Sequence, residues 1–175
     1  MTVSPPDLEI TPATAADLAA VAEIYAHYVT GSVVTFDETP PDVGQWRQRL
    51  ADLTGRGLPF LVARVDGVVA GYAYAGPYRP KPAYRHTVED SIYLAPDRTG
   101  QGLGRALLGA LLPAATAAGA RQMIAVVADS GDEASTALHR RFGFVEVGRL
   151  VRVGHKHGRW LDTVLMQRNL TAEPG

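Results

Sequence analysis

The amino-acid sequence predicts an α/β (α+β) fold with a mixed, mostly antiparallel central sheet of about six to seven strands and helices on both faces. Three observations predict it. Segments with strand or helix spacing follow one another in the order β-α-α-β-β-β-α-β-α-β-β. Two apolar runs are joined by Asp66 and Gly67, a pair typical of a tight hairpin turn. A glycine-rich stretch, residues 97–108, links a strand-like run to a segment with helical spacing.

The N-terminal elements are predicted to be a short strand over residues 8–10 and two helices. Thr14 to Asp17 has the pattern of a capping box in which Asp replaces Glu. Apolar side chains then recur on one helical face, namely Leu18, Val21, Ala22, Tyr25, Tyr28 and Val29. Pro40 and Pro41 are expected to begin the second helix, and Gly55 and Gly57 to end it.

The middle of the chain contains the hairpin and the glycine-rich turn. The hairpin strands are predicted over residues 60–65 and 68–75, followed by a proline-broken loop over 76–82. A further strand over residues 87–94 leads into the turn and into a helix that extends to Gly119. Pro113 lies inside this helix, so we expect it to kink the helix or to end it early.

The C-terminal third is predicted to form a buried strand over residues 123–128 and a helix over 132–142, stopped by Gly143. Two closing strands, 144–153 and 160–166, are joined by a polar turn at 155–159. The sequence has no internal repeat, low-complexity tract or linker. We therefore expect one domain over residues 1–175, with a core of about residues 8–170 and short disordered termini.

Composition and charge exclude several classes of protein. The hydrophobic fraction of 46% and the charged fraction of 20% are ordinary for a soluble globular chain. A formal net charge of −1 argues against nucleic acid or an anionic membrane as the main partner. The sequence contains no cysteine, which excludes disulfides, thiolate metal sites and a cysteinyl acyl-enzyme. Residues 1–10 lack the pattern of a signal peptide and no apolar run has membrane-spanning length, so a cytoplasmic protein is predicted.

The glycine-rich turn is the first candidate binding site. Gly100, Gly102 and Gly104 leave backbone N–H groups free to converge at a helix start, where the partial positive charge favours phosphate groups. No Gly-Lys-Ser/Thr sequence closes the turn, so it is not a Walker loop, and Arg105 occupies the place of the third glycine in the dinucleotide fingerprint. A turn that merely permits a tight corner between strand and helix is the structural alternative.

Six blocks of sequence, in this order, resemble the GNAT superfamily of acetyl-CoA-dependent N-acetyltransferases, and within it the phosphinothricin / methionine sulfoximine acetyltransferase branch. The blocks are residues 71–79, 87–89, 92–94, 100–104, 138–144 and 154–162. The resemblance extends over about residues 10–170. It implies the GNAT fold, acetyl-CoA as co-substrate, a small-molecule amine as acceptor and a homodimer.

The resemblance also implies a set of residues that bind the cofactor, several of them through the backbone. They are Ile92, Tyr93, Leu94, Gly100, Gln101, Gly102, Leu103, Gly104, Arg105, Asp132 and Ser135. Two positions depart from the family pattern. Thr99 stands where the family usually has Arg or Gln, and Asp132 where relatives commonly have Asn. We expect backbone binding of the pyrophosphate to survive the first change, and Asp132 to retain a helix-capping role.

Glu89 and His139 are the candidate catalytic residues. Glu89 lies among apolar strand residues, and partial burial would raise its pKa and allow it to accept a proton from the acceptor ammonium. The resemblance places the catalytic glutamate at this position. His139 occupies the position from which the family protonates the departing thiolate, usually with a tyrosine. The structural alternatives are a solvent-facing strand carboxylate and a helix histidine that is bonded to a backbone carbonyl.

The acceptor site is predicted around Arg79, Lys81, Glu89, Asp90 and Ser91. Arg79 matches the substrate-contacting arginine of the branch, and a guanidinium suits the carboxylate or phosphinate of an amino-acid analogue. A solvated loop stiffened by prolines is the alternative. His155, His157 and Asp162 lack a ligand set with metal-like spacing, so no metal site is expected.

The function predicted from these residues is transfer of the acetyl group of acetyl-CoA to the amino group of a phosphinothricin-like or methionine sulfoximine-like amino-acid analogue. Because the sequence has no cysteine, direct attack in a ternary complex is the simplest route. Two alternatives stay open. One is acetylation of another amine, such as a protein N-terminus, a lysine or another small amine. The other is an acyl-CoA-binding sensor without turnover.

Overall fold

A computed structural model describes residues 7–171 of the chain, so the predicted disordered termini largely fall outside the described residues. Within that range, seven strands form one sheet in the order β1-β2-β3-β4-β5-β7-β6. The strands are β1 (Leu8–Pro12), β2 (Phe60–Val65), β3 (Val68–Pro77), β4 (Thr87–Leu94), β5 (Gln122–Ala128), β6 (Val145–Lys156) and β7 (Arg159–Asn169). The helices are α1 (Leu18–Gly31), α2 (Val43–Gly55), α3 (Leu103–Ala117) and α4 (Ala134–Arg141). The predicted order of elements and the fold class are confirmed.

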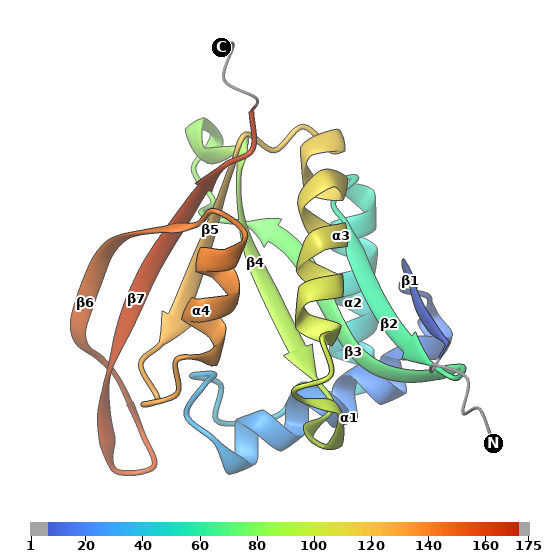
Figure 1. Cartoon of the computed structure of the whole chain (residues 1–175), viewed down its shortest axis with the longest axis horizontal. Coiled ribbons are helices and arrows are strands. Elements are labelled where there is room, and N and C mark those ends of the chain that lie inside the picture. Colours follow the sequence, from blue (N-terminus) through green and yellow to red (C-terminus); the bar gives the residue numbers. More distant parts are fainter. Residues whose placement is uncertain (1–6, 172–175) are drawn as a thin grey trace.

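Helices cover both faces of the sheet, α1 and α2 on one face and α3 and α4 on the other (Figure 1). The alternation of side chains along β2 shows how one strand serves both faces. Phe60 and Val62 pack with α1 and α2, whereas Leu61 and Ala63 pack with α3. A strand that is buried on both faces reads as a continuous apolar run, and residues 60–63 have that pattern. Among the described residues, no helix has the length and apolar character needed to cross a membrane.

The starts of the first two helices are fixed by side-chain caps. The Asp17 carboxylate accepts a hydrogen bond from the backbone N–H of Thr14 at 2.8 Å, which confirms the predicted capping box before α1. The second helix begins at Val43, a little later than the prolines suggested. Asp42 is its N-cap, because its carboxylate accepts from the Gln45 backbone N–H at 2.8 Å and the Gln45 side chain bonds back to Asp42.

Three boundaries differ from the prediction. Helix α3 continues past Pro113 to Ala117, so an early end at the proline is wrong. Pro113 has no N–H to donate to the Gly109 carbonyl, which therefore loses its helical partner. Both residues lie on the exposed face of the helix, where water can solvate that carbonyl. Helix α4 begins only at Ala134. Strands β6 and β7 extend further than predicted, so that only His157 and Gly158 remain as the turn between them.

Strands β4 and β5 form the parallel pair of an otherwise antiparallel sheet, and they separate early. They pair only at Thr87 with Gln122, Val88 with Met123 and Glu89 with Ile124. Beyond Glu89 the two strands diverge, and the sheet opens into a V whose apex lies at the start of both strands (Figure 1). This opening positions the candidate site.

Gly71 on β3 packs closely against both β4 and α3. A Cβ atom there would lie 2.7 Å from Leu94 Cδ2 and 3.1 Å from the Tyr93 carbonyl oxygen. We expect Gly71→Ala to lower the free energy of unfolding by about 1–3 kcal/mol, because the backbone cannot yield without moving β4. Urea unfolding measures this change. Gly55→Ala is the matched control, since no atom lies within 4 Å of its added Cβ and its unfolding free energy should be unchanged or slightly higher.

Candidate active site

Successive residues of β4 direct their backbone N–H and C=O groups alternately toward the two neighbouring strands, β3 and β5. Ala95 N–H donates to the Ala70 carbonyl at 2.8 Å, and Tyr78 N–H donates to the Thr87 carbonyl at 3.3 Å. The odd-numbered residues of β4 therefore direct their N–H and C=O groups to β3, and the even-numbered ones direct theirs to β5. After Glu89 that side has no partner strand. The N–H and C=O groups of Ile92 and the N–H of Leu94 consequently face the opening, where a ligand can pair with them, whereas the Leu94 carbonyl accepts a hydrogen bond from the Tyr28 hydroxyl at 2.5 Å.

A cleft of about 510 Å³ occupies the opening between β4 and β5. Its lining includes Glu89 to Leu94 of β4 and Ala125 to Ala128 of β5. The side chains of β4 divide the cleft into two sides. Val88 packs with α3, so Asp90 points to the α3/α4 face, and Glu89 points to the α1/α2 face. One ligand can therefore enter from each face and meet the other at the apex.

The glycine-rich turn lies at the edge of this cleft and starts α3. Gly100 has φ +74° and Gly102 has φ +81°, in the left-handed region that favours glycine. Ala106 N–H makes the first helical bond, to the Gly102 carbonyl, so the N–H groups of the three preceding residues are not used by the helix. This is the arrangement that suits a phosphate. Thr99 and Gly104 line the cleft, whereas Gly100, Gln101, Gly102, Leu103 and Arg105 are outside its lining.

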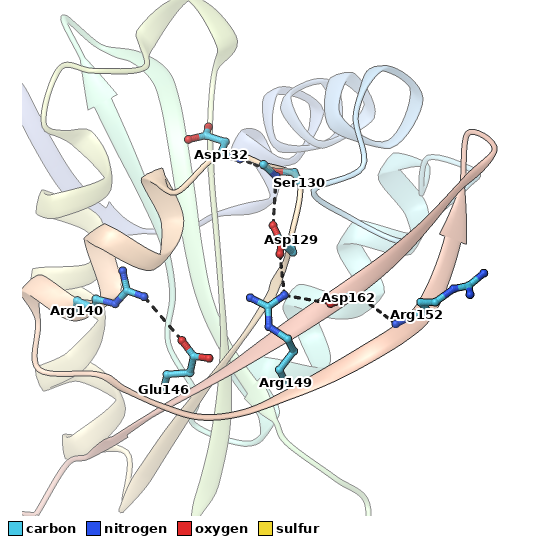
Figure 2. Close-up of polar contacts among 9 residues, drawn as sticks. Asp129, Ser130, Asp132, Arg140, Glu146, Arg149, Arg152 and Asp162 are labelled. Atoms are coloured by element: carbon cyan, nitrogen blue, oxygen red, sulfur yellow. Dashed lines mark hydrogen bonds and ion pairs between the residues drawn. The ribbon is translucent and has the colours of Figure 1, made fainter.

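Asp132 and Ser135 line the cleft on the α3/α4 face. Asp132 Oδ1 accepts from the Ala134 backbone N–H at 2.9 Å, but the N-cap of α4 is Glu133, so Asp132 bonds to the first helical residue without being the cap that the sequence predicts. A polar cluster between β5, β6 and β7 holds the loop that connects β5 to α4 (Figure 2). In it, Arg149 Nη1 contacts Asp129 Oδ2 at 2.7 Å and Asp162 Oδ2 at 3.1 Å. The hydrogen bond from Arg149 lowers the pKa of Asp129.

His139 and Asp90 form a buried pair on the α3/α4 face. His139 Nε2 lies 2.7 Å from Asp90 Oδ2, and the two residues are 4% and 8% exposed. His139 Nδ1 lies 2.7 Å from the Ser135 carbonyl, so this nitrogen carries a proton. Burial opposes the charged ring, yet the hydrogen bond and charge of Asp90 and the Ser135 carbonyl together raise the pKa of His139. Both ring nitrogens thus have protein partners: the backbone carbonyl is the partner that the structural alternative predicts, whereas nothing in the sequence pattern indicates Asp90.

Glu89 is half-buried on the α1/α2 face. Burial is the largest cause that raises the pKa of its carboxyl group, and the neighbouring charge of Asp90 adds to it. The Arg79 guanidinium acts in the opposite direction. A carboxylate with a raised pKa beside an open cleft is suited to accept a proton from an ammonium group.

Arg79 and Lys81 lie outside the cleft. They line a second cavity of about 820 Å³, together with Tyr78, Tyr84 and residues 118–120, which follow α3. The Arg79 guanidinium carbon lies 5.2 Å from the centre of the Tyr78 ring, and its charge still acts on Glu89. The two predicted groups of acceptor residues, the basic loop and the β4 residues, are therefore adjacent but not in one pocket.

The sequence analysis missed the residues that line the cleft on the α1 side and on β7. They are Tyr25, Tyr28, Val34, Thr35, Phe36 and Thr163. In the sequence, Tyr25 and Tyr28 indicate only the apolar face of a helix. Nothing in the local pattern distinguishes an aromatic residue that packs on the sheet from one that also borders a cleft. Among the described residues, no group of three His, Cys, Asp or Glu side chains could hold a metal ion.

Comparison with known proteins identifies the class and then the family. The chain is an acetyltransferase: the model of the acetyltransferase (GNAT) family matches residues 20–144. It therefore belongs to the GNAT family. It is 53% identical over 156 residues to a phosphinothricin N-acetyltransferase from Alcaligenes faecalis, which covers 89% of this chain and 79% of the relative.

Two further relatives agree with this assignment. An L-methionine sulfoximine/L-methionine sulfone acetyltransferase from Pseudomonas aeruginosa is 44% identical over 163 residues, covering 92% of this chain and 94% of the relative. The crystal structure of a GNAT superfamily phosphinothricin acetyltransferase from Sinorhizobium meliloti, in complex with acetyl-CoA, superimposes with a TM-score of 0.88. It is 47% identical, covering 93% of this chain and 88% of that one.

The opposing effects of Asp90 and Arg79 on Glu89 can be measured. We expect Arg79→Met to raise the pKa of Glu89 further, because a favourable positive charge is removed. The carboxyl ¹³C chemical shift of Glu89, followed against pH, reports that pKa. Since Arg79 is exposed, the shift should shrink at high salt. Lys81→Met is the matched control and should leave the titration unchanged; equal shifts in both variants would contradict the assignment.

Proposed function

We propose that this enzyme transfers the acetyl group of acetyl-CoA to the α-amino group of a small amino-acid analogue of the phosphinothricin or methionine sulfoximine type. The observation that carries the proposal is a cleft that passes through the sheet, with a carboxylate of raised pKa on the α1/α2 face. The names of the relatives supply the acceptor class. Because residues from both faces of the sheet line the cleft, two ligands would meet at its apex, as direct transfer in a ternary complex requires.

The cofactor is assigned to the α3/α4 face. The backbone N–H groups of the glycine-rich turn and of Leu103 to Arg105 would bind the pyrophosphate. The pantetheine arm would then extend along β4 and pair with the N–H and C=O groups of Ile92 and the N–H of Leu94, as an added strand does. Tyr93 directs its backbone to β3 and packs its ring on the α1/α2 face against Tyr25, so it would support the strand rather than contact the cofactor itself. Asp132 and Ser135 would flank the arm from the start of α4.

Glu89 is the proposed general base, and it accepts the proton of the acceptor ammonium directly or through a water molecule. The free amine attacks the thioester carbon and the C–N bond forms, the attacking nitrogen then loses its second proton to water, and the C–S bond breaks to release the thiolate. His139 is the proposed acid for that thiolate. Its protonated form is favoured by Asp90, and it must release one of its two partners to reach the sulfur. With no cysteine in the chain, a cysteinyl acyl-enzyme cannot form.

The acceptor is assigned to the α1/α2 face. Ser91 points to the same face as Glu89 and can contact the acceptor, whereas Asp90 acts through His139 and through its charge on Glu89. Arg79 and Lys81 would attract the carboxylate or phosphinate of the acceptor from the adjoining cavity. An acceptor that places its amine at Glu89 and an anionic group near Arg79 would connect the cleft with that cavity.

A homodimer is part of the proposal. Strand β6 is an edge of the sheet and exposes a row of large apolar side chains. They are Val145, Val147, Leu150, Val151 and Val153, and Trp160 follows on β7. Apolar residues exposed in a row on an edge strand favour association with a second copy. The net charge of −1 gives no support for a nucleic-acid partner, and a cytoplasmic location is proposed because acetyl-CoA is made inside the cell.

Turnover of defined acceptors tests the proposal. Purified enzyme with acetyl-CoA should release thiol in the presence of phosphinothricin or methionine sulfone, with one acetylated product per thiol. Peptides with a free N-terminus or a lysine should give far lower kcat/KM. A higher kcat/KM for the peptides would contradict the proposed acceptor class and assign a peptide amine as the acceptor instead. Binding of acetyl-CoA without turnover of any acceptor would favour a sensor instead.

Replacement of the proposed base separates catalysis from binding. Glu89→Gln should lower kcat by about 10²–10⁴-fold, because the acceptor amine then loses its proton acceptor. The dissociation constant of acetyl-CoA, measured by calorimetry, should stay unchanged. Glu9→Gln, on the exposed edge strand β1, is the control and should behave as the wild type. A kcat for Glu89→Gln within a few-fold of the wild type would contradict the assigned role.

A further inference from the structure

The segment between α1 and α2 contains no helix or strand, yet it borders the cleft. Val34, Thr35 and Phe36 line it on the α1/α2 face. Val34 is 39% exposed and Phe36 is 38% exposed, so two large apolar side chains stand at the mouth of the cleft. A segment without regular secondary structure holds such side chains in place only if other parts of the fold anchor it. We call residues 32–42 the α1–α2 loop.

Two hydroxyl contacts anchor this loop to α1. The Tyr25 hydroxyl lies 2.7 Å from Thr35 Oγ1 and donates to Asp37 Oδ2 at 2.5 Å. The Tyr25 ring packs edge-on against Tyr93 of β4, with ring centres 5.0 Å apart. The anchor on this side therefore rests on the strand that borders the cleft.

The other anchor comes from the far end of the chain. Lys156 on β6 is 3% exposed, and its ammonium donates to the Thr35 carbonyl at 2.8 Å. Next to it, the ring of Phe36 lies directly over Gly154, where any side chain would overlap it. Thr35 is thus held from two sides, by a tyrosine hydroxyl at its side chain and by an ammonium at its carbonyl.

A lysine is a costly choice for a buried position. Burial lowers the pKa of Lys156, while the charges of Asp37 and Glu38 act in the opposite direction. A methionine would occupy a similar volume without a buried charge. The ammonium group therefore adds little to packing, and its one hydrogen bond within the described residues goes to the loop.

We infer that Lys156 is a positioning residue that fixes the α1–α2 loop over the acceptor end of the cleft, and thereby sets the affinity for the acceptor without touching it. The inference rests on the proposed function, because it assigns the acceptor to the α1/α2 face. The α3/α4 face, where the cofactor is assigned, has no contact with Lys156 among the hydrogen bonds of the described residues. Loss of the hydrogen bond from Lys156 should therefore weaken the binding of the acceptor and leave the binding of acetyl-CoA unchanged.

Lys156→Met tests the inference through a split between kinetic parameters. The KM for methionine sulfone should rise about ten-fold or more, as expected for one charge-assisted hydrogen bond. The dissociation constant of acetyl-CoA and the kcat at saturating acceptor should stay within about two-fold. Lys156→Arg, which keeps the charge and the donor, should recover most of the loss. Thr30→Val, which removes an exposed hydroxyl contact within α1, is the control and should change nothing.

Amide hydrogen exchange gives a readout that needs no turnover. Exchange of residues 33–38 should become faster in Lys156→Met and in Tyr25→Phe, whereas exchange in β2 and β3 should not change. If the wild type acetylates no acceptor but the loop amides respond, the proposed function fails and the anchor stands. Unchanged loop exchange, or equal rises in the KM for acceptor and for acetyl-CoA, would overturn the inference. Tyr25→Phe keeps its ring, so it tests the loop even if Lys156→Met folds poorly.

Discussion

The site depends on one constraint, which is that β4 and β5 stop pairing after Glu89. A sheet rarely leaves central backbone groups without partners, because each unpaired N–H or C=O costs free energy when it is removed from water. Here the lost pairing leaves both backbone groups of Ile92 and the N–H of Leu94 open to a ligand, while the Tyr28 hydroxyl bonds to the Leu94 carbonyl, and it creates the cleft. It also places Glu89 and Asp90 at the apex, with their side chains on opposite faces. The loss of pairing between β4 and β5 thus supplies backbone groups that can bind a ligand, and it also places the two substrates on opposite faces of the sheet.

The rest of the fold holds this opening in shape. On the α3/α4 face, the buried pair of Asp90 and His139 connects β4 to α4 across the gap. On the α1/α2 face, the α1–α2 loop is held between Tyr25 and Lys156. Both contacts use polar groups in buried surroundings, where an unpaired partner would be strongly unfavourable. They therefore specify the geometry of the cleft more than they add to stability.

Local patterns in the sequence predicted much of the fold and part of the site. The hairpin at Asp66, the glycine-rich turn and the strand with Glu89 each have a signal within a few residues. The pairing of Asp90 with His139 spans 49 residues and that of Lys156 with Thr35 spans 121, so no local period reveals either. The early helix end that Pro113 suggests does not occur, because the sequence pattern does not show which face of the helix is exposed to water. The roles of Glu89 and His139 came from the family resemblance, and they stay predictions.

Residue-resolved amide exchange along β4 tests the central claim most directly. In the free protein, the amides of Ser91 and Tyr93 bond to β3 and should exchange slowly, while those of Ile92 and Leu94 face the cleft and should exchange fast. Saturation with acetyl-CoA should slow Ile92 and Leu94 selectively and leave their two neighbours as they were. Uniform protection along β4 in the free protein, or no response of Ile92 and Leu94 to the cofactor, would contradict the account.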